Sequence, residues 1–245
     1  IKIDWTCPVT QGLDYFILAD ESITPRNLVT RQLATPQGAF ATGGGSNATQ
    51  TVNEAGYSYF TNNSAGTSDR FDMTLPVTYG QMHSALVIAK FDSIVPSAFP
   101  RLFYIDNGGG ANYLNMFVRH TTNIMFVQLG LGGGSTNFTS NAAAVVPGTV
   151  QAFGYTIDGS SGDGGYSPIL YVDGDARSSS GTSPISGLIT GTSCRTAFMN
   201  DNAASANMMQ GNIFAVMHWN RALTATEMKW ASTYWYKMIQ GNHVG

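Results

Sequence analysis

Apolar and polar positions alternate along much of the chain, at the period expected of strands whose two sides face different surroundings. In residues 150–157, for example, Phe153, Tyr155 and Ile157 share one side, and Gly154 lies on the other. Segments rich in glycine, asparagine and aspartate separate such stretches and favour turns. On this basis strands are predicted at residues 83–91, 99–106, 112–119, 123–130, 150–157, 168–174, 195–201 and 211–219.

The last of these strands, residues 211–219, leads directly into a helical pattern. Its alternation predicts one face formed by Ile213, Ala215, Met217 and Trp219 and an opposite face formed by Phe214, Val216 and His218. Thr224 and Glu227 follow at the spacing of a capping box, in which each side chain bonds to the other residue's backbone amide. The strand is therefore expected to end where a capped helix begins.

Apolar residues continue at helical spacing after the capping box. They are Met228, Ala231, Trp235 and Met238, with Tyr234 and Ile239 widening the stripe. The pattern predicts a helix of roughly four turns within residues 224–240, ended by Gly241. An amphipathic helix is stabilised mainly by the surface that it covers, so Met228 and Trp235 are expected to be buried against the strands.

Many short strands without alternating helices predict an all-β fold, an antiparallel two-sheet sandwich with a short C-terminal helix packed on it. The 245 residues suit one domain spanning residues 1–245. Residues 41–50 are the most linker-like segment and are expected to form a surface loop. The start of the chain lacks the pattern of a signal peptide. It begins with Ile1 in place of methionine, so we expect it to be part of a longer chain.

Composition narrows the classes of function. Only 11% of residues are charged, the formal net charge is -3, and no basic run occurs, which argues against a nucleic-acid partner. No stretch approaches the ~20 apolar residues of a membrane span, so no membrane insertion is expected. Cys7 and Cys194 are the only cysteines, and either a disulfide or two buried thiols fits them, the thiols better.

Three segments together resemble the concanavalin A-like, laminin-G-like jelly rolls. The first is the opening of the chain, where Ile3, Trp5, Pro8, Gly12 and Leu13 match and Cys7 stands where histidine is usual. The second is the end of a strand pair at Tyr171, Val172, Asp173 and Gly174. The third is the C-terminal turn and helix start at Asn220, Arg221, Ala222, Leu223, Thr224 and Glu227. The matches lie at both ends and in the middle of the chain, so the resemblance covers its whole length.

The resemblance implies a jelly-roll sandwich, and the opening is similar to laminin-G-like domains of bacteriophage and prophage structural proteins. It therefore implies a non-enzymatic virion surface module, such as a capsid decoration, head-fibre or tail-fibre domain. Such a module would be homo-oligomeric or lattice-bound, with other virion proteins or surface glycans as partners. The alternative is a secreted or cell-surface carbohydrate-binding module, alone or appended to a glycosidase. Both place the chain on a virion surface or outside the cell.

Catalytic residues are not evident in the sequence. Glycosidases of this fold carry paired carboxylates on one strand, and this chain has no such set. Glutamate occurs only at positions 21, 54 and 227, and Asp173 and Asp175 flank a turn glycine. No Gly-x-Ser-x-Gly motif or phosphate-binding glycine loop occurs either. We therefore expect no enzymatic activity and no cofactor.

Two candidate binding sites lie in loops. Asp106, Asn107, Asn112 and Tyr113 combine hydrogen-bonding groups with an aromatic ring, as carbohydrate sites do. Asp158 and Asp163 share a glycine-rich loop and are weaker candidates for Ca²⁺ ligands. Turn formation accounts for this aspartate pair better than a metal site does.

Overall fold

The computed structural model describes most of the chain. It covers residues 2–19, 25–37, 46–52, 55–62, 70–75, 82–91, 99–106, 112–119, 121–131, 134–141, 144–159, 168–177, 194–198, 209 and 211–240. For some of these, among them residues 46–62 and 194–198, only the backbone is described. The statements below refer to these residues.

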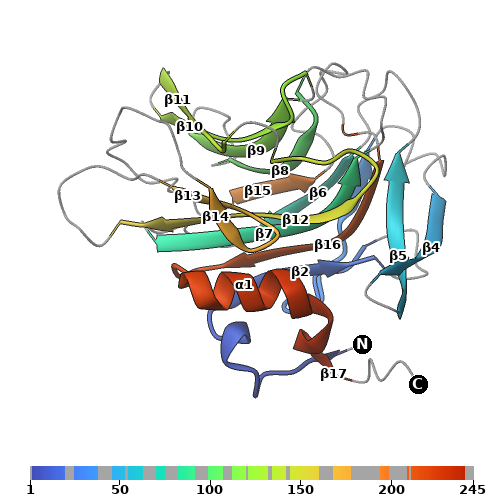
Figure 1. Cartoon of the computed structure of the whole chain (residues 1–245). Coiled ribbons are helices and arrows are strands. Elements are labelled where there is room, and N and C mark those ends of the chain that lie inside the picture. The colour runs from blue at the N-terminus through green and yellow to red at the C-terminus, as the bar shows by residue number, and fades with distance from the viewer. Residues whose placement is uncertain are drawn as a thin grey trace.

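Two antiparallel sheets lie one above the other (Figure 1). The seven-stranded sheet has the order β11 (Gly134–Thr139), β10 (Ile124–Leu131), β9 (Tyr113–Arg119), β8 (Arg101–Asp106), β15 (Cys194–Phe198), β6 (Arg70–Leu75) and β3 (Thr35–Gln37). The eight-stranded sheet has the order β14 (Asp175–Arg177), β13 (Ile169–Val172), β12 (Val150–Asp158), β7 (Met82–Phe91), β16 (Gly211–Trp219), β5 (Ala55–Asn62) and β4 (Ser46–Val52), and β2 (Leu13–Leu18) also pairs with β16. The predicted all-β sandwich is confirmed.

The predicted strands agree with the structure, but residues 41–50 were assigned wrongly. Each predicted strand overlaps an observed one, from β7 through β16. In place of a loop, the chain forms β4 from Ser46, and β4 pairs with β5 along its whole length. Threonine at alternate positions favours a strand there, although glycines precede it. Residues 41–45 lie outside the described part of the chain.

The inner faces of the two sheets form the main core. Phe153, Tyr155 and Ile157 of β12 all point into it, as their alternation predicted. In β16 the predicted faces hold from Ala215 onward but not at Ile213, which belongs to this core. The register of β16 against β7 shifts between Ile213 and Ala215, which is the signature of a bulge. One extra residue exchanges the two faces, so Phe214 points to the other side of the sheet.

The C-terminal helix covers the outside of the eight-stranded sheet (Figure 1). Helix α1 (Ala225–Tyr234) is followed by the 3-10 turn η4 (Trp235–Met238). The predicted stripe is buried, with Met228 at 0% and Trp235 at 1% exposure. Gly154 of β12 allows this close approach, since a Cβ there would lie 3.0 Å from Met228 Sδ. The prediction was wrong for Tyr234, which is 37% exposed, and Gly241 lies outside the described residues.

The two ends of the chain meet beside this helix. The capping box is present, with the Glu227 amide donating to Thr224 Oγ1 and the Thr224 amide donating to the Glu227 carboxylate. Arg221 donates to both Glu227 carboxylate oxygens, at 3.0 and 2.8 Å, and to the Gln11 carbonyl at 2.7 Å. The Asn220 amide donates to the Gly12 carbonyl. Residues that carried the resemblance at opposite ends of the sequence are therefore joined by one hydrogen-bond network.

Shorter elements complete this end of the molecule. Strand β1 (Lys2–Ile3) pairs antiparallel with β17 (Ile239–Gln240), and the 3-10 turn η1 (Pro8–Thr10) lies between β1 and β2. Cys7 is half-buried and its thiol is free. None of the described helices combines the length and apolar character that crossing a membrane requires.

The β13–β14 hairpin has the tight turn that its sequence indicates. Asp173 and Gly174 both have positive φ, at 54° and 74°, as the central residues of a type I′ turn do. A Cβ on Gly174 would lie 2.7 Å from the Lys229 backbone, so glycine also lets the turn lie against α1. The Asp173 carboxylate accepts from the Ala152 amide and from the Gln151 side chain, both at 2.9 Å. Asp173 is thus a structural residue of the turn.

Candidate functional site

Strand β9 presents two chemically different faces. Leu114, Met116 and Val118 point into the core between the sheets. The residues between and beside them lie on the outer face, in the order Tyr113, Asn115, Phe117 and Arg119. The outer face of a two-sheet sandwich normally carries ordinary polar side chains, so this sequence of aromatic, amide and guanidinium groups calls for an explanation.

The neighbouring strands extend the outer face sideways. Arg101 of β8 and Phe126 of β10 are the cross-strand partners of Phe117. The Arg101 guanidinium carbon lies 4.4 Å from the centroid of the Phe117 ring. Phe117 and Phe126 are stacked, with centroids 5.0 Å apart and planes 13° from parallel. Paired strands therefore place an arginine on one side of an aromatic stack.

Arg119 completes the arrangement from the end of β9. Its guanidinium carbon lies 5.0 Å from the centroid of Phe126 and 5.5 Å from that of Phe99. Phe99 in turn meets Phe117 edge to face, at 5.9 Å between centroids. We call Phe99, Arg101, Phe117, Arg119 and Phe126 the arginine–aromatic ladder. Cation–π contacts hold both guanidinium groups over ring faces, while their N–H groups lie in the guanidinium plane.

Hydrogen bonding distinguishes the two arginines. With the amide oxygen of Asn115 turned toward Arg101, that oxygen accepts from Nε and Nη1 of Arg101, at 3.2 Å each. Asn115 is only 2% exposed, so its buried side chain holds the Arg101 guanidinium group in one orientation. Within the described residues no carboxylate lies within ion-pair distance of Arg119. Arg119 is also half-buried, so its charge lies in a partly desolvated position that no described carboxylate neutralises.

The predicted loop site lies at the other end of the same face. Asp106 and Tyr113 are cross-strand partners, and Asn112 precedes Tyr113 directly, so the structure brings these three together. Asp106 is only 3% exposed. The Tyr113 ring stacks on Tyr104 at 5.9 Å and lies over Gly130, where any side chain would collide with it. Of the predicted residues, half-buried Asn112 and Tyr113 can reach a ligand better than Asp106 can.

Other predicted residues do not join this site. Asn107 and Asp163 lie outside the described residues, and Asp158 is exposed at the end of β12. No group of three or more His, Cys, Asp or Glu side chains suited to a metal ion occurs among the described residues. The described structure thus contains no assembled Ca²⁺ site around Asp158.

Sequence reasoning missed the ladder itself. The signal was present in residues 112–119, where aromatic and charged residues alternate with aliphatic ones. That alternation predicts the strand and its outer face, but not the partners. Arg101 and Phe126 become neighbours of Phe117 only through the order of strands β8, β9 and β10.

Of the carboxylates considered for catalysis, Asp173, Asp175 and Glu227 make structural contacts, while Glu21 and Glu54 lie outside the described residues. Asp175 pairs with Lys229 at 2.6 Å, and Asp72 pairs with Arg70 at 2.8 Å. The Arg221 side chain, with further hydrogen bonds from Thr224, lowers the pKa of Glu227 to about 2, although partial burial acts in the opposite direction. Glu227 therefore stays ionised in its cap and is a poor general acid.

A buried polar chain crosses the eight-stranded sheet at one end. His218 Nδ1 lies 2.7 Å from Asp14 Oδ1, and His218 Nε2 lies 3.3 Å from His83 Nδ1, which is 3.2 Å from the Tyr155 hydroxyl. Burial, and to a smaller extent the neighbouring His218, lowers the pKa of His83 well below its usual value. His83 is thus neutral at physiological pH. At 4% exposure it cannot meet a large substrate, so we interpret the chain as a polar element of the core, in which Asp14 Oδ2 has no hydrogen-bond partner among the described residues.

Comparison with known proteins supports the fold but does not assign a family. No protein-family model matches the sequence, and no curated protein matches it. Solved structures do match the fold. A Trypanosoma rangeli sialidase in complex with 2,3-difluorosialic acid is 15% identical, with a TM-score of 0.60, over 94% of this chain and 34% of the sialidase.

Two further structures show the same likeness. The receptor-binding domain of botulinum neurotoxin type G is 10% identical, with a TM-score of 0.58, over 89% of this chain and 50% of that domain. The CBM40 of a Ruminococcus gnavus sialidase, bound to α2,3-sialyllactose, is 12% identical, with a TM-score of 0.48, over 62% of this chain and 83% of that module. For the sialidase and the toxin domain, similarity at identities this low indicates a shared β-sandwich architecture and no more.

Proposed function

We propose that the protein is a non-enzymatic carbohydrate-binding module and that the outer face of β8, β9 and β10 binds the glycan. The arginine–aromatic ladder is the observation that carries this proposal. The stacked Phe117 and Phe126 rings are themselves buried, at 4% and 6% exposure, so the apolar surface within reach of a ligand is that of half-buried Phe99 and of the guanidinium groups that lie over the rings. The guanidinium N–H groups add hydrogen-bond donors. Sugar rings present apolar CH faces and hydroxyl groups, which match both features.

The chemistry of the ladder favours a sugar with a carboxylate. A guanidinium group pairs with a carboxylate through two parallel hydrogen bonds, and such charge-assisted bonds are stronger than neutral ones. Arg119 has no carboxylate partner among the described residues, so an acidic sugar would supply the missing charge. The sialidase of similar fold, which was solved with a sialic acid derivative, is in keeping with this ligand class.

The two functions considered from the sequence are unequally supported. The solved structures of similar fold include a sialidase and a toxin receptor-binding domain, and the carbohydrate-binding alternative agrees with them better than the virion reading does. A virion location, with other virion proteins as partners and a homo-oligomeric or lattice-bound state, stays a prediction. A glycan-binding module can also serve on a particle surface, so the proposed function is compatible with either setting.

A glycan array with the intact chain tests the proposal. We expect binding to glycans that end in a carboxylated sugar and weaker binding to their neutral counterparts. Replacing Arg119 with alanine should lower the affinity for such a glycan by about tenfold or more, because a charge-assisted bidentate contact is lost. Arg119→Lys keeps the positive charge but not the paired N–H donors of the guanidinium group, so it should keep only part of the affinity.

The matched control is Lys2→Ala, which removes an exposed positive charge on β1, away from the ladder. It should leave binding unchanged, since steering by net charge alone would respond to both variants. Chromatography of the bound glycan after incubation should recover it intact. Affinity unaffected by Arg119→Ala, or cleaved product, would contradict the proposed site or the non-enzymatic role, respectively.

A further inference from the structure

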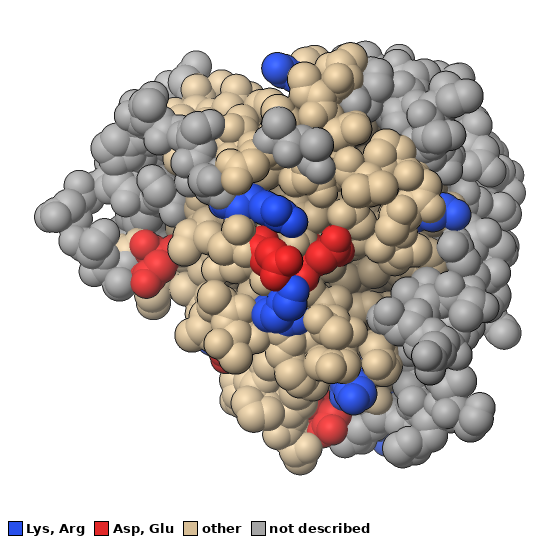
Figure 2. Space-filling view, viewed as in Figure 1, with Lys and Arg blue, Asp and Glu red and all other residues tan. Residues whose placement is uncertain are grey.

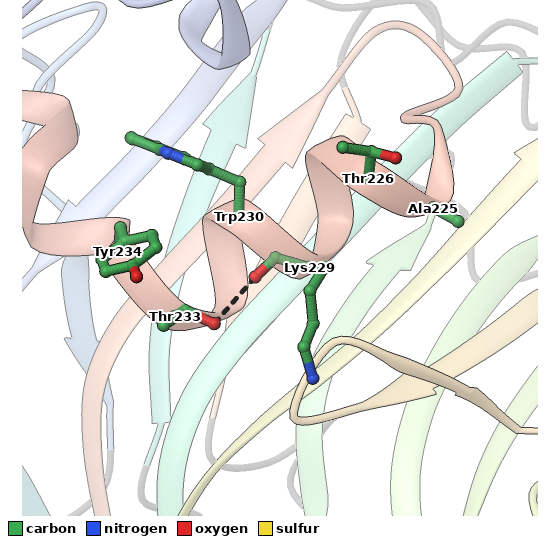
Figure 3. A pocket seen from close by; sticks show the side chains of 6 residues that line it. All are labelled: Ala225, Thr226, Lys229, Trp230, Thr233 and Tyr234. Atoms are coloured by element: carbon green, nitrogen blue, oxygen red, sulfur yellow. Dashed lines mark hydrogen bonds between the residues drawn. The ribbon is translucent and has the colours of Figure 1, made fainter.

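A shallow hollow lies on the exposed side of helix α1 (Figure 3). Helix α1 lies on the other side of the two sheets from strands β8, β9 and β10, which carry the ladder (Figure 1). The volume of the hollow is about 630 Å³, and its lining comes from a single helix: Ala225, Thr226, Lys229, Trp230, Thr233 and Tyr234. Ligand pockets for small molecules typically measure roughly 300–1,000 Å³. The hollow therefore has room for a small ligand, although it is open to solvent on one side.

The aromatic residues of the hollow are not needed to dock the helix. Met228, Ala231 and Trp235 already attach α1 to the sheet, and all three are buried. Tyr234 is 37% exposed, and Trp230 only partly packs against the core. The two rings have centroids 5.8 Å apart and planes inclined by 51° (Figure 3). The outward face of a surface helix is usually polar, so this pair is unusual.

Lys229 is the one charged residue that lines the hollow, and it is paired within the chain; Lys237 lies beside the hollow, with its ammonium group 4.5 Å from the centroid of the Tyr234 ring. Lys229 points toward the β13–β14 hairpin, where its ammonium group lies 2.6 Å from the Asp175 carboxylate and 3.0 Å from the Asp173 carbonyl (Figure 3). Figure 2 shows a small group of acidic and basic side chains near the middle of this side of the molecule. The residues that line the hollow therefore present no unpaired charge to a ligand, in contrast to the ladder.

Hydroxyl groups border the two rings. Thr226 is exposed at one end of the hollow, and Tyr234 presents its phenol at the other (Figure 3). Thr233 donates its hydroxyl to the Lys229 carbonyl at 3.0 Å, which leaves the hydroxyl oxygen as an acceptor. Aromatic rings beside neutral hydrogen-bonding groups are complementary to a sugar, which combines an apolar ring face with hydroxyl groups.

We propose that this hollow is a second carbohydrate site, which stacks an uncharged sugar unit on Trp230 and Tyr234. A protein partner fits less well, since stable protein interfaces take about 20–30 residues from each side and this lining comprises far fewer. The second site does not depend on the ladder. If both sites bind, one molecule holds two glycan chains on opposite sides of its sheets, and linked sites raise apparent affinity for a glycan-covered surface.

Calorimetric titration with cellohexaose, xylohexaose and maltohexaose, as uncharged probes, tests the inference on the intact chain. We expect at least one hexaose to bind, and Trp230→Ala to weaken that binding by about tenfold through the lost stacking surface. Tyr234→Ala is the second variant, because Tyr234 is more exposed and its removal should leave the melting temperature unchanged. Trp5→Ala, at a site where the indole is 49% exposed outside the hollow, is the matched control and should change nothing.

Other outcomes would overturn the inference. Lack of binding by all three hexaoses excludes the proposed ligand class, and binding unaffected by Trp230→Ala and Tyr234→Ala excludes the hollow. Sedimentation that shows self-association, abolished by Tyr234→Ala, would identify the hollow as a contact between copies of the chain. Arg119→Ala separates the two sites. It should leave hexaose binding intact, whether the acidic-glycan site is confirmed or rejected.

Discussion

The outer faces of the two sheets differ in what covers them. Helix α1 and the two chain ends cover the eight-stranded sheet with apolar side chains, among them Trp235 and Met228. On the seven-stranded sheet no described helix covers the ladder, and guanidinium groups instead lie directly on aromatic rings. The outer face of the eight-stranded sheet is covered by the chain itself. The outer face of the seven-stranded sheet carries charged groups that water or a ligand can reach.

The polar groups make the same distinction. Beside the helix, Glu227 receives bonds from Arg221 and Thr224, and Lys229 meets Asp175, so the charges there are paired within the chain. On the ladder, Arg119 has aromatic neighbours and no carboxylate among the described residues. Intramolecular pairing stabilises the first face, whereas the second keeps donors available. The contrast predicts large stability effects on the helix side and large binding effects on the ladder.

The largest expected effect is on the helix side. Trp235→Ala should lower the free energy of unfolding by roughly 3–5 kcal/mol, because it leaves a cavity under η4 where the side chain is 1% exposed. Urea unfolding followed by circular dichroism measures the change. An unchanged unfolding midpoint would mean that the helix contributes little, and the contrast between the two faces would fail.

The second-largest effect is expected from acid, which should lower the stability of the helix side through Glu227. The pKa of Glu227 is about 2 when folded and near 4.5 in its ordinary state, so its ionised form stabilises the fold above pH 4.5. That contribution is lost as the pH falls from 4.5 toward 2, because the unfolded chain takes up the proton first. Urea midpoints measured across this range should fall less steeply for Glu227→Gln than for the native chain. Parallel profiles for the two proteins would contradict the assignment.

A smaller effect is expected at the helix N-terminus. Thr224→Ala removes the hydroxyl that accepts the Glu227 amide, and losses of such caps cost about 1 kcal/mol. The unfolding midpoint should shift accordingly, and Thr224→Ser should restore it because serine keeps the acceptor. A serine variant as unstable as the alanine variant would show that the methyl group, rather than the cap, is what matters.

The smallest stability effect should come from the ladder. Arg119→Ala removes a half-buried side chain that forms no ion pair with a described residue, so the free energy of unfolding should change by no more than about 0.5–1 kcal/mol. Thermal unfolding beside the glycan titration measures both quantities on one sample. A loss as large as that of Trp235→Ala would make Arg119 a structural residue and remove the distinction between the faces.

Local patterns predicted the elements well. The alternation in residues 150–157 and the capping box at Thr224 and Glu227 depend on neighbours close in sequence, and the structure confirms both. The bulge between Ile213 and Ala215 was not predicted, because an apolar strand gives no sign of which residue is extra. Tyr234 was placed on the buried stripe because the helical period alone cannot tell its edge from its centre.

The candidate site was harder to predict than the fold. Tyr113 and Asn112 were chosen for their side-chain chemistry, and they do lie at one end of the face that carries the ladder. Phe117 meets Arg101 and Phe126 only through pairing of three strands, which no short pattern specifies. Sequence therefore predicts which residue types are available, and strand order decides which of them meet.

The pairing of β1 with β17 has a mechanical consequence. Lys2 faces Gln240 and Ile3 faces Ile239 in antiparallel register, so the two chain ends leave the structure in the same direction. A pulling force applied to both ends would load these hydrogen bonds one after another, as a zipper opens, rather than all together in shear. A molecule held under tension by its ends would thus yield first at this short strand pair, while the two sheets and both proposed sugar sites remain folded.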